Sequence, residues 1–121
     1  MGRTRIVVVE TPEFLARTKK LLSEAQRTAL IDRLSADPAA GELIEGTGGV
    51  RKLRLALEGR GKRGGARVIY FHHDAGMPLF LLTAYAKNDK SDLTAAERNA
   101  MRRLTDILVR CYRGARDDQD R

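Results

Sequence analysis

Residues 66–86, ARVIYFHHDAGMPLFLLTAYA, decide the fold of this chain. Two runs rich in branched and aromatic residues, 66–72 and 79–86, flank a turn signal at residues 74–78. A third such run, residues 50–57, precedes them across a glycine-bearing segment. Runs of this kind separated by turn signals predict three antiparallel strands. Because residues 79–86 are apolar on both faces, we expect this strand to be central and covered by a helix.

The segment before these strands predicts a strand and a helical hairpin. Residues 6–9 are a short β-branched run, and Thr11-Pro12 then opens a helix to about Leu22. The capping-box sequence Ser23-Glu24-Ala25-Gln26 starts a second helix to about Ala36. Two helices joined so closely form an antiparallel hairpin. Helical spacing predicts these core residues of the first helix: Phe14, Leu15, Thr18, Leu21 and Leu22.

A last helix is expected from a second capping-box sequence, Thr94-Ala95-Ala96-Glu97, to about Tyr112. Its predicted apolar stripe is Met101, Leu104, Leu108 and Cys111. The element order β-α-α-β-β-β-α predicts a small α+β domain, an antiparallel-rich sheet with helices packed on one side. We expect one domain over residues 1–113 and a frayed tail over residues 114–121.

Composition limits the class of protein. The chain has 121 residues, enough for one domain with its own core. Cys111 is its single cysteine, so no internal disulfide can form, which suits a reducing cytosol. No run approaches the ~20 apolar residues of a membrane helix, and the apolar run at residues 6–9 is too short for a secretory signal. We expect a soluble, cytoplasmic protein without a membrane partner.

The positive charge of the chain is concentrated on the predicted strands. Residues 46–90 hold nine Lys or Arg and three acids, a net +6 of the formal +7. A cationic surface on a folded scaffold is what a polyanion-binding protein needs. A generally basic soluble domain is the plain alternative. If the chain reverses at residues 74–78, Arg67 lies beside the 85–87 end of the next strand, and Lys52 and Arg54 share one face.

Clustered cations repel one another unless an anion is present, so this arrangement predicts a phosphate site. Arginine binds phosphate through its planar fork, and a lysine whose pKa is lowered among cations can take a proton at neutral pH. Other motifs are weaker. Residues 59–64 match G-x-G-x-x-G, but a strand follows instead of a helix, which excludes a dinucleotide site. His72 and His73 are adjacent and point to opposite faces, so we expect no metal site and no cofactor.

Three blocks of sequence resemble the HigB branch of the RelE-like bacterial toxins. They are Gly46-Thr47-Gly48-Gly49-Val50-Arg51-Lys52-Leu53-Arg54, then the segment from Gly59 to Tyr70 with Arg67, then Leu81-Leu82-Thr83 to Leu93 with Tyr85 and Lys87. The resemblance implies a RelE-like domain and a metal-independent endoribonuclease that cleaves messenger RNA, usually on the ribosome, by attack of the ribose 2′-OH.

The same resemblance implies roles for single residues. Arg67 would stabilise the phosphorane-like transition state, Lys87 would do the same or protonate the leaving oxygen, and Lys52 would be the general base. RNA or phosphate binding is expected at Arg51, Arg54, Lys62, Arg63, Tyr85 and Lys90. Tyr85 would either stack on an RNA base or simply pack within the protein. Lys62 and Arg63 lie at the tip of the predicted hairpin, and for them a merely solvated turn is the alternative to phosphate binding.

The resemblance also implies partners. It predicts a cognate antitoxin, a helix-turn-helix protein of the HigA type. The toxin would bind operator DNA only as part of the complex with this antitoxin. Messenger RNA and the ribosome are the other expected partners. Two alternatives stay open: a non-catalytic nucleic-acid-binding module with the same basic sheet, and a related toxin that acts on DNA gyrase.

Overall fold

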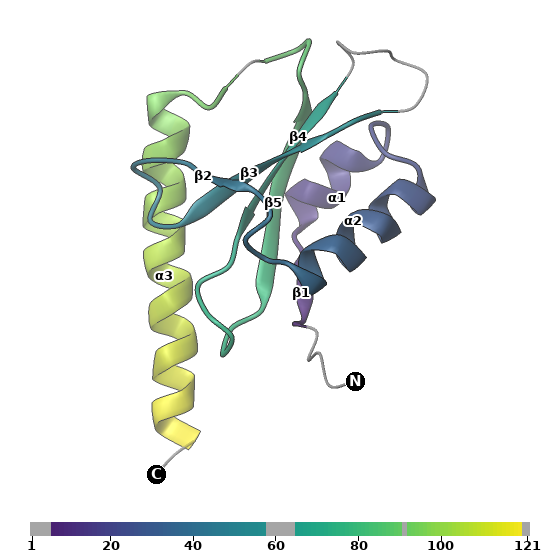
Figure 1. Ribbon diagram of the computed structural model, residues 1–121. Coiled ribbons are helices and arrows are strands. Elements are labelled where there is room, and N and C mark those ends of the chain that lie inside the picture. Colours follow the sequence, from purple (N-terminus) through teal and green to yellow (C-terminus); the bar gives the residue numbers. More distant parts are fainter. Residues whose placement is uncertain (1–5, 58–64, 91, 120–121) are drawn as a thin grey trace.

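The computed structural model describes residues 6–57, 65–90 and 92–119, and confirms the α+β class and the predicted order of elements (Figure 1). One short strand, β2, was not predicted. The elements are β1 (Val8–Glu10), α1 (Pro12–Thr18), α2 (Glu24–Ala36), β2 (Glu42–Leu43), β3 (Val50–Leu55), β4 (Ala66–Phe71), β5 (Leu79–Ala86) and α3 (Ala95–Gln119).

The strands form one mixed sheet in the order β1-β5-β4-β3-β2. β1 is parallel to β5, and the other neighbours are antiparallel. β5 lies between β1 and β4, and seven of its eight residues are buried, which confirms the predicted central strand. Its apolar side chains on both faces are explained by this position, because each face of the sheet packs against a helical layer.

The prediction that the helices pack on one side of the sheet is wrong. Phe14, Leu30 and Leu34 of α1 and α2 pack with one sheet face, on which Val68 and Leu81 lie. α3 packs on the opposite face with another set of sheet residues, namely Val50, Ile69, Phe71, Phe80 and Leu82. Figure 1 shows α3 on one side of the sheet and the α1–α2 pair on the other. The molecule therefore has three layers.

The N-terminal helices begin where their caps predict. The Thr11 hydroxyl accepts from the Phe14 N–H, and Ser23 and Gln26 form the reciprocal capping box. α1 ends at Thr18, before the predicted Leu22. Of the predicted core residues, Phe14, Thr18 and Leu22 are buried and Leu21 is partly buried, whereas Leu15 is 41% exposed.

α3 differs from its prediction in phase and in length. Cys111 is exposed and Leu104 is 38% exposed, so the predicted core position of both is wrong. The side chains that face the sheet are Met101, Thr105, Leu108, Val109 and Tyr112. α3 is helical to Gln119, beyond the predicted end near residue 112. None of the helices in the described part of the chain is long and apolar enough to span a membrane.

Tyr70 ties the middle of the sheet to the segment that follows α2. Its side chain is fully buried, and its hydroxyl donates to the Pro38 carbonyl at 2.8 Å and accepts from the Gly41 N–H at 2.8 Å. Burial raises the pKa of this hydroxyl, so it stays protonated at neutral pH. Gly41 itself must be small, because a Cβ there would lie 2.9 Å from the Lys52 carbonyl oxygen.

We expect Tyr70→Phe to lower the free energy of unfolding by about 1–3 kcal/mol, because it leaves a buried donor and a buried acceptor unsatisfied. Urea unfolding followed by circular dichroism measures the change. Tyr112→Phe is the matched control. The Tyr112 ring packs edge-on against Phe80, and its hydroxyl makes no hydrogen bond to the described residues. Equal stability of the two variants would contradict the assigned role of the Tyr70 hydroxyl.

Candidate functional site

Three strands place Arg54, Arg67 and Tyr85 in one row across the sheet. Arg67 of β4 lies directly opposite Arg54 of β3 and directly opposite Tyr85 of β5. Residues opposite each other in an antiparallel pair share one face, with Cβ atoms about 5 Å apart. Lys52 lies two residues before Arg54 and therefore on the same face. Lys52 is directly opposite Ile69, whose side chain packs against α3. The row therefore lies on the α3 side of the sheet, next to the part that α3 covers.

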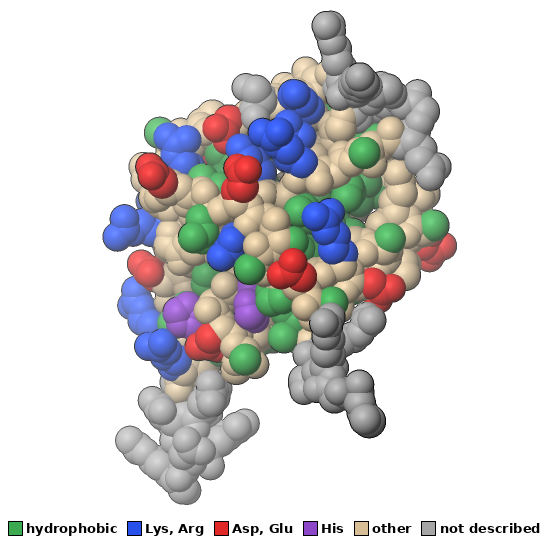
Figure 2. Space-filling view, viewed as in Figure 1, with side chains coloured by type: hydrophobic (Ala, Val, Ile, Leu, Met, Phe, Trp, Pro, Cys, Tyr) green, Lys and Arg blue, Asp and Glu red, His purple; other side chains and the backbone are tan. Residues whose placement is uncertain are grey.

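Lys87 adds a fourth cation at the same end of the sheet. It directly follows β5, and its N–H donates to the Gly65 carbonyl at 2.9 Å, so main-chain pairing of β4 and β5 reaches this residue. The two-residue period of a strand places Lys87 on the face of Tyr85. We call Lys52, Arg54, Arg67 and Lys87 the basic cluster. Figure 2 shows Lys and Arg side chains gathered toward the top of the molecule, with acidic side chains next to them.

Arg67 is the least usual member of the basic cluster. It is only 7% exposed, and a buried arginine normally has several hydrogen-bond partners. Among the described residues its guanidinium makes one long hydrogen bond, from Nη1 to the Ala66 carbonyl at 3.4 Å. Most of its donors therefore have no protein partner in this part of the chain. A planar guanidinium with free donors can bind two oxygens of a phosphate.

The hydroxyl of Tyr85 is also buried without a hydrogen-bond partner among the described residues. Burial raises the pKa of this hydroxyl, the nearby Asp92 carboxylate raises it further, and the charge of Arg67 opposes both. The Lys90 ammonium lies 5.6 Å from the centre of the Tyr85 ring. Tyr85 thus packs beside the basic cluster and holds a proton that it can donate.

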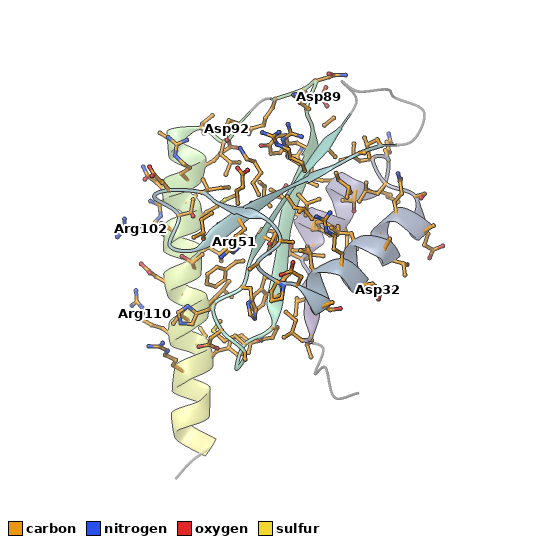
Figure 3. All side chains as sticks on the ribbon, in the orientation of Figure 1. Asp32, Arg51, Asp89, Asp92, Arg102 and Arg110 are labelled. Atoms are coloured by element: carbon orange, nitrogen blue, oxygen red, sulfur yellow. The ribbon has the colours of Figure 1, made fainter. Side chains whose placement is uncertain are left out.

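Lys52 is paired with an acid from the segment that leads into α3. Its Nζ lies 3.6 Å from Oδ1 of Asp92, whose position at the start of α3 is labelled in Figure 3. Both residues line a groove of about 540 Å³ together with Glu42 and Arg98. Glu42 lies directly opposite Lys52 on β2. The sequence predicts no site role for Glu42 or Asp92, because strand pairing and the packing of α3 on the sheet bring them next to Lys52.

Other predicted site residues are not brought into the basic cluster. Arg51 faces the α1–α2 side with Tyr70, and its Nη1 donates to the carbonyls of Gly41 at 2.6 Å and Ala39 at 3.4 Å. Lys90 forms an ion pair with Glu97, and its hydrogen bond holds the pKa of the Glu97 carboxyl below its usual value. The predicted Lys62-Arg63 tip lies outside the described residues.

The two histidines lie at the other end of β4. His72 follows the strand directly, about 17 Å along the chain from Arg67 at the usual rise of a strand. Burial lowers the pKa of His72, and His73 is exposed beside Asp74. The described residues contain no group of three or more potential ligands that could hold a metal ion.

Comparison with known proteins identifies the family. Residues 12–115 match the family described as RelE toxin of the RelE/RelB toxin–antitoxin system. The chain belongs to this family of toxins, whose members are paired with an antitoxin. A solved structure of the E. coli toxin RelE, a double arginine-to-alanine mutant in the free state, is similar in fold. The two are 17% identical, with a TM-score of 0.52 over 72% of this chain and 88% of that one.

We expect Arg54→Gln to raise the free energy of unfolding by about 0.2–1 kcal/mol, because like charges directly opposite each other in a sheet are destabilising. Thermal unfolding at low salt measures the change. Arg103→Gln, on the exposed surface of α3, is the control for loss of one charge. Added sulfate should stabilise the parent more than the variant. A less stable Arg54→Gln protein would contradict repulsion within the basic cluster.

Proposed function

We propose that this chain is a metal-independent endoribonuclease of the HigB kind that cleaves messenger RNA on the ribosome. The observation that carries the proposal is Arg67, which lies between Arg54 and Tyr85, is only 7% exposed and leaves most of its guanidinium donors unpaired among the described residues. Family membership supports a toxin, and the basic cluster supports a phosphate as the group on which it acts.

The reaction is a transesterification within the RNA strand. The ribose 2′-hydroxyl loses its proton to water as its oxygen attacks the adjacent phosphorus. The bond from phosphorus to the 5′ oxygen breaks, and the products are a 2′,3′-cyclic phosphate and a 5′-hydroxyl. Arg67, flanked by Arg54, binds the equatorial oxygens, where negative charge grows in the transition state. Lys87, exposed at the end of β5, gives a proton to the leaving 5′ oxygen.

We expect Arg67→Ala and Lys87→Ala each to lower the cleavage rate by about a hundred- to a thousandfold, because each removes a charge that acts on the transition state. The measurement is induced expression without antitoxin, with growth followed beside primer-extension mapping of messenger RNA ends. Arg110→Ala is the matched control, since this arginine lies on α3 on the side away from the sheet (Figure 3).

Each outcome separates the proposed function from its alternatives. Growth arrest with new RNA ends in the parent and in Arg110→Ala, but not in the two cluster variants, supports the nuclease. Arrest without RNA cuts would favour a gyrase-directed toxin. RNA binding without arrest or cuts would favour a binding module. Cleavage by purified protein of free RNA as fast as of ribosome-bound RNA would contradict ribosome dependence.

The partner we propose is a small HigA-type antitoxin with a helix-turn-helix, through which the complex would bind operator DNA in the cytoplasm. The net charge of +7 supports an acidic binding segment in such a partner. We expect the tagged toxin, isolated from its native host, to carry a small protein encoded beside it. Isolation of the toxin alone under low-salt conditions would contradict this pairing.

A further inference from the structure

Lys52 and Asp92 meet from two separate parts of the fold. Lys52 is on β3, and Asp92 lies just before α3, forty residues later. The ammonium and the carboxylate are 3.6 Å apart. The Lys52 side chain is 19% exposed, so its methylene groups are mostly packed, whereas Asp92 is 59% exposed. The pair stands at the border of the basic cluster, beside the groove that both residues line.

Asp92 is held in place by the main chain of its neighbour. Its Oδ1 accepts from the Leu93 N–H at 2.8 Å, and the carbonyl of Leu93 accepts from Arg98 Nη1 at 2.9 Å. The Leu93 side chain is 5% exposed and belongs to the α3-side core. The hydrogen bond from Leu93 lowers the pKa of Asp92, and the charge of Lys52 lowers it further. Asp92 is therefore a fixed anion at neutral pH.

We propose that Asp92 is a positioning residue that holds Lys52 as a charged ammonium, and that Lys52 acts as a fixed cation on the RNA phosphate rather than as the general base. This inference rests on the proposed ribonuclease function. A general base must lose its proton before it can accept one, and here that loss would leave the Asp92 carboxylate without its ammonium partner.

The other charged and titratable groups around Lys52 come from every neighbouring element. They are Arg33 of α2, Glu42 of β2, Glu45 in the turn after β2, Arg54 of β3, Arg67 of β4, Tyr85 of β5, and Asp92 with Arg98 next to the start of α3. The cations disfavour a further positive charge, whereas the three carboxylates favour it. Asp92 is the acid within ion-pair distance of the Lys52 ammonium, and Glu42 lies directly across from Lys52 on β2, so both favour the charged form of this lysine.

The chemistry balances without a basic lysine. The bond from the 2′ oxygen to phosphorus forms, and the bond from phosphorus to the 5′ oxygen breaks. The proton of the 2′-hydroxyl passes to water, and the 5′ oxygen takes a proton from Lys87. Lys52 keeps its three protons throughout and stabilises the extra charge on the phosphate oxygens, as a preorganised cation does.

Substitution of Lys52 by arginine separates the two roles, because an arginine keeps its charge but cannot serve as a base. We expect purified Lys52→Arg to cleave ribosome-bound RNA within about tenfold of the parent rate, and Lys52→Ala to lose about a hundredfold or more. If Lys52→Arg is as slow as Lys52→Ala while remaining folded by circular dichroism, Lys52 is the base and the inference is overturned.

Asp92→Asn tests the positioning role. It keeps an oxygen that can accept from the Leu93 N–H and removes the charge, so we expect a several-fold lower maximal rate. Asp89→Asn is the matched control from the same turn and should cleave like the parent. In the Lys52→Ala background Asp92→Asn should have no further effect, because the two residues act as one unit. Equal effects with and without Lys52 would overturn the positioning role.

The same assays distinguish failure of this inference from failure of the proposed function. An active parent with an inactive Lys52→Arg variant overturns only the role given to Lys52. A parent that binds RNA but makes no cuts, on the ribosome or off it, overturns the ribonuclease proposal and this inference together.

Discussion

The pairing of β4 with β5 joins the hydrophobic core to the basic cluster. Val68 and Leu81 of these strands pack under α1 and α2, whereas Ile69 and Leu82 pack under α3. A slip of one residue in this register would exchange the two faces and turn Arg67 into the wrong layer. The apolar residues on both sides of the central strand therefore fix the position of a charged side chain that belongs to neither hydrophobic cluster.

The basic cluster works against stability. Arg54 and Arg67 are directly opposite each other, and Arg67 is almost fully buried. Repulsion between the two and the loss of hydration of Arg67 both cost free energy, which the surrounding core offsets. A bound phosphate would relieve both costs, because it supplies opposite charge and acceptors for the guanidinium. Stored strain of this kind is expected where a protein binds a polyanion.

Much of this arrangement follows from local sequence. The run of residues 66–72, the turn at 74–78 and the run of 79–86 predict the hairpin, and the period of two then places Arg67 beside Tyr85. Capping residues Ser23 and Thr94 mark the starts of α2 and α3, and their reciprocal hydrogen bonds are present. These features depend on neighbours within a few residues, which is why a pattern predicts them.

The wrong predictions concern the α3 stripe and the placement of the helices, both of which depend on contacts between distant segments. The phase of α3 differs from the apolar pattern because Thr105 is buried in place of an apolar residue, and its hydroxyl donates to the carbonyls of Thr47 and Arg102. Hydrophobic spacing alone favoured Cys111, which is exposed. Apolar faces likewise show that β5 is covered on both sides but do not say which helix takes which face.

Two acids near the basic cluster each pair with a lysine. Glu97 binds Lys90, and Asp92 lies within ion-pair distance of Lys52, so each of these lysines has a local counter-charge. Arg54 and Arg67 have no acidic partner among the described residues. Since a carboxylate competes with phosphate for the same cation, the two unpaired arginines are better placed than these lysines to bind a phosphate. The acids thus limit repulsion at and next to the edge of the basic cluster and leave its two arginines free for an anion.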